Sequence, residues 1–295
     1  MEFHPAQTGQ VVSITRDKAT PRQFDDILRN ALQHGQLALH FQPIVKPNGN
    51  IIGAESKLRW LEPRPHKHQP ARLLETIDDA ELISEIARWE LTQACALIAT
   101  VAAARPQNDF QFVSVAIDSR YFEQSDFAED VLGLIQNAAI DPARLRCEIK
   151  EDVAVRDIAA TIEKLQKLQD AGISCQMGQF GTGYASLTHL HRLPLTAIKI
   201  DRLLISHINE HPQHQSLVDA SVAMAQYMDK DCIIDGVESH DDLLYFQDVG
   251  IDAMQGGAFP EANDARSFVE LLENGSLFDF REYAQQTPLY QVAGI

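Results

Sequence analysis

The sequence is poor in cysteine and in basic residues, and each shortage excludes a class of protein. Its 295 residues include 4 cysteines, which stand far apart with no Cys-x-x-Cys pair. Three of the four lie in apolar runs, so we expect small buried side chains rather than disulfides or metal ligands. Lysine and arginine total 25 against 42 aspartates and glutamates, which gives a net charge of −17. A field of that sign repels nucleic acid and anionic membrane, and neither is expected as a partner.

Long hydrophobic runs are missing as well. The longest apolar region, around Cys95 to Ala104, is too short and too interrupted to span a bilayer. The N-terminus has no apolar core of the kind that signal peptides contain. Together these two absences predict a cytoplasmic protein.

The chain does contain a regular alternation of helical and strand patterns. A helical face at 23–34 precedes two strands at 38–45 and 51–60, which a turn at 47–50 joins into a hairpin. Further helical patterns occur at 82–104, 126–138, 155–171, 214–228, 240–249 and 264–274, with apolar strands at 111–117, 145–151, 173–178, 196–200, 231–237 and 252–255. Such alternation predicts a parallel α/β sheet, and the number of units suits a closed barrel of about 250 residues. Periodicity alone also fits an open, doubly wound sheet.

The two ends of the chain lack this alternation. Residues 1–22 are polar and contain Pro5 and Pro21, which predicts a loose tail. Residues 278–295 are rich in glutamine with weak periodicity, which predicts a C-terminal extension. The domain is therefore expected to occupy residues 23–277.

Several short motifs occur in order along this domain. They are FQPIV at 41–45, GAESKLRW at 53–60, GQFGTGYASL at 178–187, LP…KIDR from 193 to 202, DGVES at 235–239 and QG at 255–256. Their sequences and order resemble those of EAL domains, the bacterial cyclic-di-GMP phosphodiesterases, over roughly residues 23–275. This resemblance implies a modified (β/α)8, TIM-like barrel whose first strand runs antiparallel to the rest.

The resemblance also points to a degenerate metal site. In the family, acidic and amide side chains at strand ends hold two divalent metal ions. Here Ala116 replaces an asparagine, Gly178 and Gln179 replace two aspartates, and Asp235 replaces a glutamate. Hard divalent cations need oxygen ligands, and a pair of them would activate the attacking water. We therefore predict no metal, no cofactor, no catalytic residue and a chain that is not an enzyme.

Other family positions are kept and could bind a nucleotide. Side chains alternate along a strand, so Glu55, Lys57 and Arg59 are expected on the same side. The family arginine at this motif contacts a ligand phosphate, which makes Arg59 the expected phosphate anchor. Lys57 either replaces part of the metal charge or forms a salt bridge with Glu55, and Lys199 is either held by an acid or contacts phosphate. The full candidate set is Gln42, Glu55, Lys57, Leu58, Arg59, Glu148, Lys199, Asp201, Asp235, Glu238 and Gln255.

A loop near the third motif is implied to couple the site to a dimer interface. Its candidate residues are Glu151, Phe180, Gly181, Thr182, Gly183 and Tyr184. Glycine at 181 and 183 permits the tight backbone that such a loop needs. A homodimer is expected from the resemblance alone.

These features leave three interpretations of function. The sequence favours a catalytically inactive regulator in cyclic-di-GMP signalling, a metal-independent receptor that acts through contacts with a regulatory protein. It also fits a nucleotide-blind protein-interaction module that restrains a transcription or motility factor. A third interpretation is a very weak cyclic-di-GMP phosphodiesterase. Glu55 and Glu148 count against tight metal-free binding, because a carboxylate repels an anionic phosphate.

Overall fold

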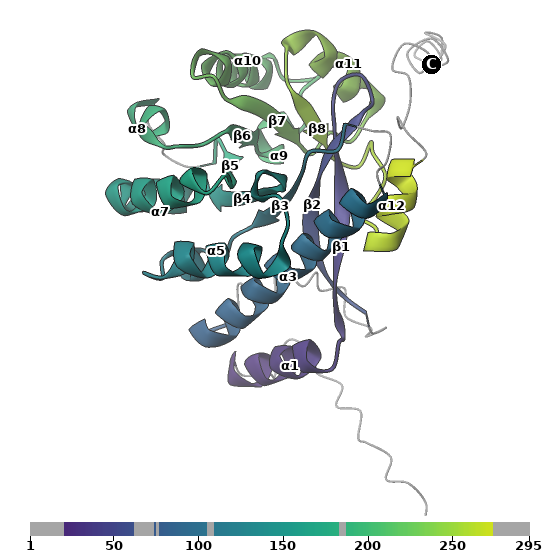
Figure 1. The fold of residues 1–295 in the computed structure, drawn as a ribbon. Coiled ribbons are helices and arrows are strands. Elements are labelled where there is room, and N and C mark those ends of the chain that lie inside the picture. The colour runs from purple at the N-terminus through teal and green to yellow at the C-terminus, as the bar shows by residue number, and fades with distance from the viewer. Residues whose placement is uncertain (1–20, 62–73, 75–76, 105–108, 183–186, 274–295) are drawn as a thin grey trace, which may run out of the picture.

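Eight strands close into a barrel in chain order, and the helices pack around it (Figure 1). The computed structural model describes residues 21–61, 74, 77–104, 109–182 and 187–273. The strands are β1 (Leu37–Val45), β2 (Ile51–Trp60), β3 (Phe112–Ala116), β4 (Leu145–Lys150), β5 (Ser174–Phe180), β6 (Ala197–Ile200), β7 (Asp231–Asp235) and β8 (Ala253–Gln255). The helices are α1 (Pro21–Gln33), α3 (Ala80–Ala104), α4 (Ser119–Phe122), α5 (Phe127–Ala138), the 3-10 turn η1 (Pro142–Arg144), α6 (Glu151–Arg156), α7 (Ile158–Asp170), α8 (Leu187–Arg192), α9 (Arg202–Ile205), α10 (Pro212–Tyr227), α11 (His240–Val249) and α12 (Ala265–Glu273).

The direction of the first strand sets the topology of the barrel. β1 runs antiparallel to both of its neighbours, β2 and β8, whereas the strands from β2 to β8 are parallel. The carboxyl ends of β2 to β8 therefore meet at one end, which we name the barrel mouth; the opposite end is the barrel floor. The predicted TIM-like barrel with an antiparallel first strand is confirmed.

Element boundaries follow the sequence patterns closely, with two informative differences. The predicted helix at 155–171 is split, because Asp157 adopts φ −133° and its side chain caps α7 by accepting a hydrogen bond from the Ala160 amide. Strand β5 runs two residues beyond its predicted end. There Gln179 takes φ 55°, and the register with β6 shifts between Met177 and Phe180. Both differences come from local backbone geometry that hydrophobic periodicity does not encode.

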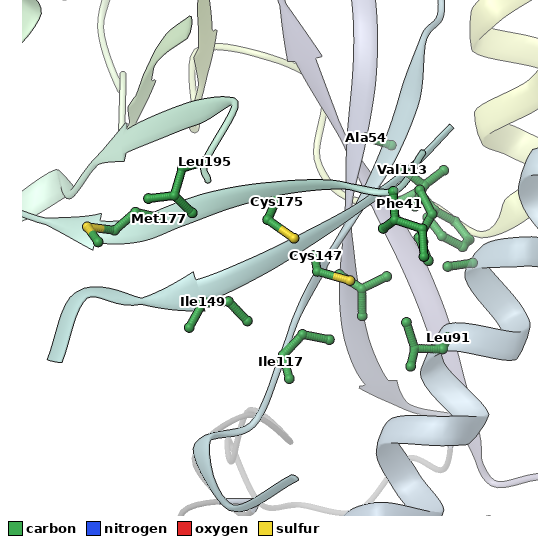
Figure 2. Packing of buried hydrophobic residues seen from close by; sticks show 14 of the residues in the cluster. Phe41, Ala54, Leu91, Val113, Ile117, Cys147, Ile149, Cys175, Met177 and Leu195 are labelled. Atoms are coloured by element: carbon green, nitrogen blue, oxygen red, sulfur yellow. The ribbon is translucent and has the colours of Figure 1, made fainter. Parts of the chain in front are cut away.

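The main core lies between the barrel and the surrounding helices. Figure 2 shows Leu91 of α3 directed toward strands that carry Cys147 and Cys175, which are register partners on β4 and β5. All four cysteines are buried and free, and burial raises the pKa of the Cys175 thiol to about 12. The thiols are therefore protonated, unreactive core groups at neutral pH, as their apolar sequence context predicted.

A second, smaller apolar cluster fills the barrel floor. Side chains from six different strands can meet only in the interior of the barrel. The members of the cluster are Ile44, Ile52, Phe112, Ala197, Ile233 and Ala253. The Arg146 guanidinium stacks over the Phe112 ring at 3.7 Å from its centroid. Apolar side chains and one stacked cation thus close this end.

The terminal segments fall mostly beyond what the structure describes. Residues 21 and 22 begin α1, and the rest of the predicted tail and extension lies outside the described residues. The division at 1–22, 23–277 and 278–295 therefore stays a prediction. No described helix combines the length and apolar character that crossing a bilayer requires.

Candidate functional site

Four charged side chains meet at the barrel mouth. The Lys199 ammonium on β6 lies between two carboxylates, with Nζ 3.0 Å from Glu55 Oε2 and 2.6 Å from Glu148 Oε2. Lys57 Nζ lies 2.7 Å from Glu55 Oε1. Glu55, Glu148 and Lys199 are only 4%, 7% and 3% exposed. Two acids and two bases therefore balance one another in a nearly dry environment.

This pairing decides the charge states of the cluster. Burial alone would raise the pKa of Glu55, but the attraction of Lys199 and Lys57 outweighs it and holds that pKa well below its ordinary value. For Glu148, burial dominates and raises the pKa, although Lys199 opposes the rise. Burial would lower the pKa of Lys199, but Glu148 and Glu55 outweigh it and raise that pKa, so the ammonium stays charged at neutral pH.

Two amides extend the cluster toward β1 and β8. Gln255 Nε2 donates to Glu55 Oε2 at 2.5 Å and to Gln42 Oε1 at 3.0 Å, which are register partners across β1 and β2. Gln42 in turn donates to the Gly256 carbonyl at 3.5 Å. Gln255 Oε1 is buried and has no hydrogen-bond partner among the described residues. Gln255 is 0% exposed, so its amide is a packed part of the cluster.

Gln176 joins the cluster from β5, although it was not among the predicted site residues. Its Nε2 donates to Glu148 Oε2 at 2.6 Å and to Ser114 Oγ at 3.2 Å, and the residue is fully buried. The available signal was a glutamine in the middle of the predicted strand at 173–178, because a buried amide needs polar partners. The nearest motif begins at Gly178, near the end of the strand, and does not include Gln176.

The three substituted metal positions lie close to this cluster. Ala116 is the last residue of β3, and Gly178 and Gln179 belong to β5; of the three, only Gly178 is buried. A Cβ at 178 would lie 2.2 Å from Glu148 Oε1, so the Glu148 carboxyl already fills the space of a side chain there.

Arg59 is the candidate phosphate anchor that the structure leaves most available. Its guanidinium is half-buried, and Nη1 donates to the Leu58 carbonyl at 3.2 Å. Among the described residues, no carboxylate lies within ion-pair distance of it. Leu58 itself is buried, at 6% exposed.

The candidates at the ends of β6 and β7 have different roles. Asp201 caps the short helix α9 by accepting from the Leu203 amide at 2.8 Å. Asp235 faces the charged cluster, and burial raises its pKa although Lys199 opposes the rise. Glu238 is exposed, and its amide donates to the Asp242 carboxylate at 3.2 Å. Of these three, Asp235 is the one that interacts with the charged cluster electrostatically.

The candidate coupling loop is fixed at its base. Glu151 Oε2 accepts a hydrogen bond from the Gly181 amide at 2.9 Å, and Gly181 adopts φ 94°. Thr182 Oγ1 donates to the Gln179 carbonyl at 2.8 Å, and Phe180 is buried. Gly183 and Tyr184 lie outside the described residues, and the homodimer stays a prediction.

The two acids of the cluster are paired with protein groups in this structure. The Lys199 ammonium lies between the Glu55 and Glu148 carboxylates, and the Glu148 carboxyl fills the space beside Gly178. In the described part of the chain, no group of three or more His, Cys, Asp or Glu is arranged to hold a metal ion. The carboxylates are engaged by ammonium and amide groups instead.

Comparison with known proteins gives a consistent family assignment. The EAL domain model matches residues 25–262. MucR of Pseudomonas aeruginosa, named a bifunctional diguanylate cyclase/cyclic di-GMP phosphodiesterase, is 30% identical over 230 residues, which cover 78% of this chain and 33% of MucR. PdeR of Escherichia coli, named a cyclic di-GMP phosphodiesterase, is 28% identical over 244 residues, which cover 83% of this chain and 36% of PdeR. This chain thus spans about a third of the length of those relatives.

The solved structures agree with that assignment. A structure of the MucR phosphodiesterase in complex with c-di-GMP matches with a TM-score of 0.78 at 30% identity, covering 83% of this chain and 99% of that chain.

These findings contradict the prediction that the chain is not an enzyme. MucR and PdeR are named as phosphodiesterases, and so is the matching structure. The prediction rested on the substitutions at Ala116, Gly178 and Gln179, whereas the mouth still brings acidic, basic and amide groups within contact distance. Three substituted positions are therefore too little ground for separating this chain from a family of enzymes.

Proposed function

This chain belongs to the EAL domain family, and from that premise we propose that its barrel mouth binds cyclic-di-GMP without needing a metal ion. In this proposal the chain acts as a receptor in cyclic-di-GMP signalling and transmits binding through contacts with a regulatory protein. The observation that carries the proposal is the position of Lys199, which pairs with two buried carboxylates at once, while Lys57 pairs with one of them.

The charge balance answers the main objection to metal-free binding. An unpaired carboxylate at contact distance from a phosphate costs about 1 kcal/mol in water and about 4 at intermediate dielectric. Glu55 is paired with both Lys57 and Lys199, and Glu148 with Lys199. These two acids and two bases sum to zero, so a phosphate near Glu55 and Glu148 meets paired charges instead of two free anions. Asp235 also faces the cluster, and burial raises its pKa, which favours the neutral form of this third acid.

Arg59 then supplies the attraction for the phosphate. It lies on β2 two residues beyond Lys57, and it has no carboxylate partner among the described residues. A guanidinium can form two parallel hydrogen bonds to phosphate, which fixes orientation as well as charge.

Calorimetric titration with cyclic-di-GMP in excess EDTA tests the proposal. We expect saturable heat from the wild-type chain, because no step of binding requires a divalent ion. Absence of heat in EDTA would support the nucleotide-blind interaction module. Heat that requires Mg²⁺ or Mn²⁺ would instead support a metal-dependent site like that implied for the family.

Arg59→Ala is the variant that tests the anchor. We expect it to weaken affinity about tenfold, equivalent to about 1.4 kcal/mol. Arg266→Ala is the matched control, since Arg266 is exposed on α12 and pairs with Glu270 at 3.1 Å. Equal affinity for both variants would refute Arg59 as the phosphate contact. Chromatography of the same samples with Mg²⁺ or Mn²⁺ measures separately whether linear dinucleotide is formed.

A further inference from the structure

A buried amide connects the floor of the barrel to its mouth. Gln176 is the third residue of β5 and has 0% exposure. Its Nε2 donates to Glu148 Oε2 at 2.6 Å, and its Oε1 accepts from Arg146 Nη1 at 3.5 Å. None of the sequence motifs includes it. A buried amide with both ends engaged transmits orientation from one neighbour to the other.

Arg146 fixes which way the amide points. A guanidinium carries only donors, so the amide oxygen must face it and the NH₂ group must face Glu148. Arg146 is itself held over the Phe112 ring and lies 3.6 Å from Asp231 Oδ2. The stacked cation at the floor therefore sets the direction of the Gln176 donor.

Two polar contacts and the free space beside Gly178 define the position of Glu148. Its Oε2 receives both the Gln176 amide, at 2.6 Å, and the Lys199 ammonium, also at 2.6 Å. Its Oε1 lies in the space that a Cβ at position 178 would occupy, at 2.2 Å from the ideal Cβ position. Only glycine at 178 leaves room for the carboxyl in this place.

We propose that Gln176 is a positioning residue, which holds the Glu148 carboxylate against Lys199 and over Gly178. Its consequence for the ligand rests on the proposed function: a Glu148 carboxylate held in this pair does not repel the phosphates of a bound cyclic dinucleotide. Loss of Gln176 frees the carboxylate to leave Lys199 and face the ligand. Gln176 touches no ligand in this proposal and acts only through Glu148.

A double-mutant cycle on cyclic-di-GMP affinity tests this. Gln176→Leu keeps a similar volume and removes all three hydrogen bonds of the amide, and we expect about a tenfold weaker Kd. In the Glu148→Ala background, the same substitution should leave Kd unchanged, because no carboxylate remains to be positioned. An equal loss in both backgrounds would overturn the proposal, since it would show a merely structural role.

Ser114→Ala is the matched control. Ser114 accepts from the same Gln176 Nε2 at 3.2 Å, and it is also fully buried. The substitution removes a polar partner of Gln176 while leaving the contact with Glu148 intact. We expect a lower melting temperature with an unchanged Kd. A Kd as weak as that of Gln176→Leu would assign the effect to general packing and overturn the proposal.

A second measurement needs no nucleotide, so its failure can be told apart from failure of the proposed function. Gly178→Ala should lower the melting temperature in the wild type and lower it less in Glu148→Ala, where the atom that the new Cβ meets is gone. A crystal structure of Gln176→Leu should show the Glu148 carboxyl displaced from Gly178. A carboxyl that stays in place, or equal melting shifts in both backgrounds, would overturn the positioning role even if the nucleotide binds.

Discussion

The floor and the mouth of the barrel are filled by side chains of opposite character. The floor is filled by six apolar side chains and one arginine stacked on Phe112. The mouth is filled by paired charges, with Lys199 between Glu55 and Glu148. Apolar packing stabilises without regard to pH, whereas buried ion pairs stabilise only while every partner keeps its charge. The difference indicates that the floor serves the fold and that the mouth is available for function.

Removing Lys199 should break the mouth more severely than any other single change considered. Lys199→Met leaves two buried carboxylates without their shared cation, which costs about 3–5 kcal/mol of unfolding free energy. These carboxyls would then favour the neutral form, so the folded state binds more protons than the unfolded chain and stability falls as pH rises. Urea unfolding should show the smallest loss of unfolding free energy at about pH 5 and the largest at about pH 8. An equal loss at both values would mean that the carboxylates are not held by charge.

A cavity at the floor should behave differently. Phe112→Ala removes a ring that is 2% exposed and supports Arg146, at an expected cost of about 3 kcal/mol. Since the lost interactions are apolar, the cost should be nearly the same at about pH 5 and about pH 8. A pH dependence like that of Lys199→Met would contradict the view that the floor is stabilised by apolar packing and the mouth by ion pairs.

Restoring the two aspartates at positions 178 and 179 tests whether the mouth can gain a metal site. Gly178→Asp with Gln179→Asp adds a Cβ that meets Glu148 and places further negative charge nearby, so we expect a loss of about 2 kcal/mol. The added oxygens would also offer ligands to a hard cation. Magnesium or manganese should therefore raise the melting temperature of the variant more than that of the wild type. Equal shifts in both would show that metal binding does not depend on these positions.

Lys57 should matter least to stability. Its side chain is 29% exposed, and Glu55 keeps Lys199 when Lys57 is removed. Lys57→Met should therefore cost about 1 kcal/mol or less in urea unfolding. A loss as large as that of Lys199→Met would place Lys57, rather than Lys199, at the centre of the charge balance.

Much of the fold could be predicted from the sequence, and less of the site. The hairpin and the alternation that follows were predicted from periodicity, whereas the closed barrel with an antiparallel first strand was implied by the resemblance to EAL domains. The bridge that Lys199 forms between Glu55 and Glu148 could not be predicted. Lys199 lies 144 residues from Glu55, and the motif fitted both a lysine held by an acid and a lysine that contacts phosphate. Gln176 was missed because its partners, Arg146 and Glu148, are contributed by a different strand.

The sequence by itself determined the order of the elements, the free buried thiols and the family, since these depend on local periodicity and on residues at fixed spacing. The tertiary structure alone decided how the charges are shared, because closure of the barrel brings side chains from separate strands within hydrogen-bond distance. It also decided that the Glu148 carboxyl fills the space beside Gly178, because steric fit between separate strands cannot be derived from a motif.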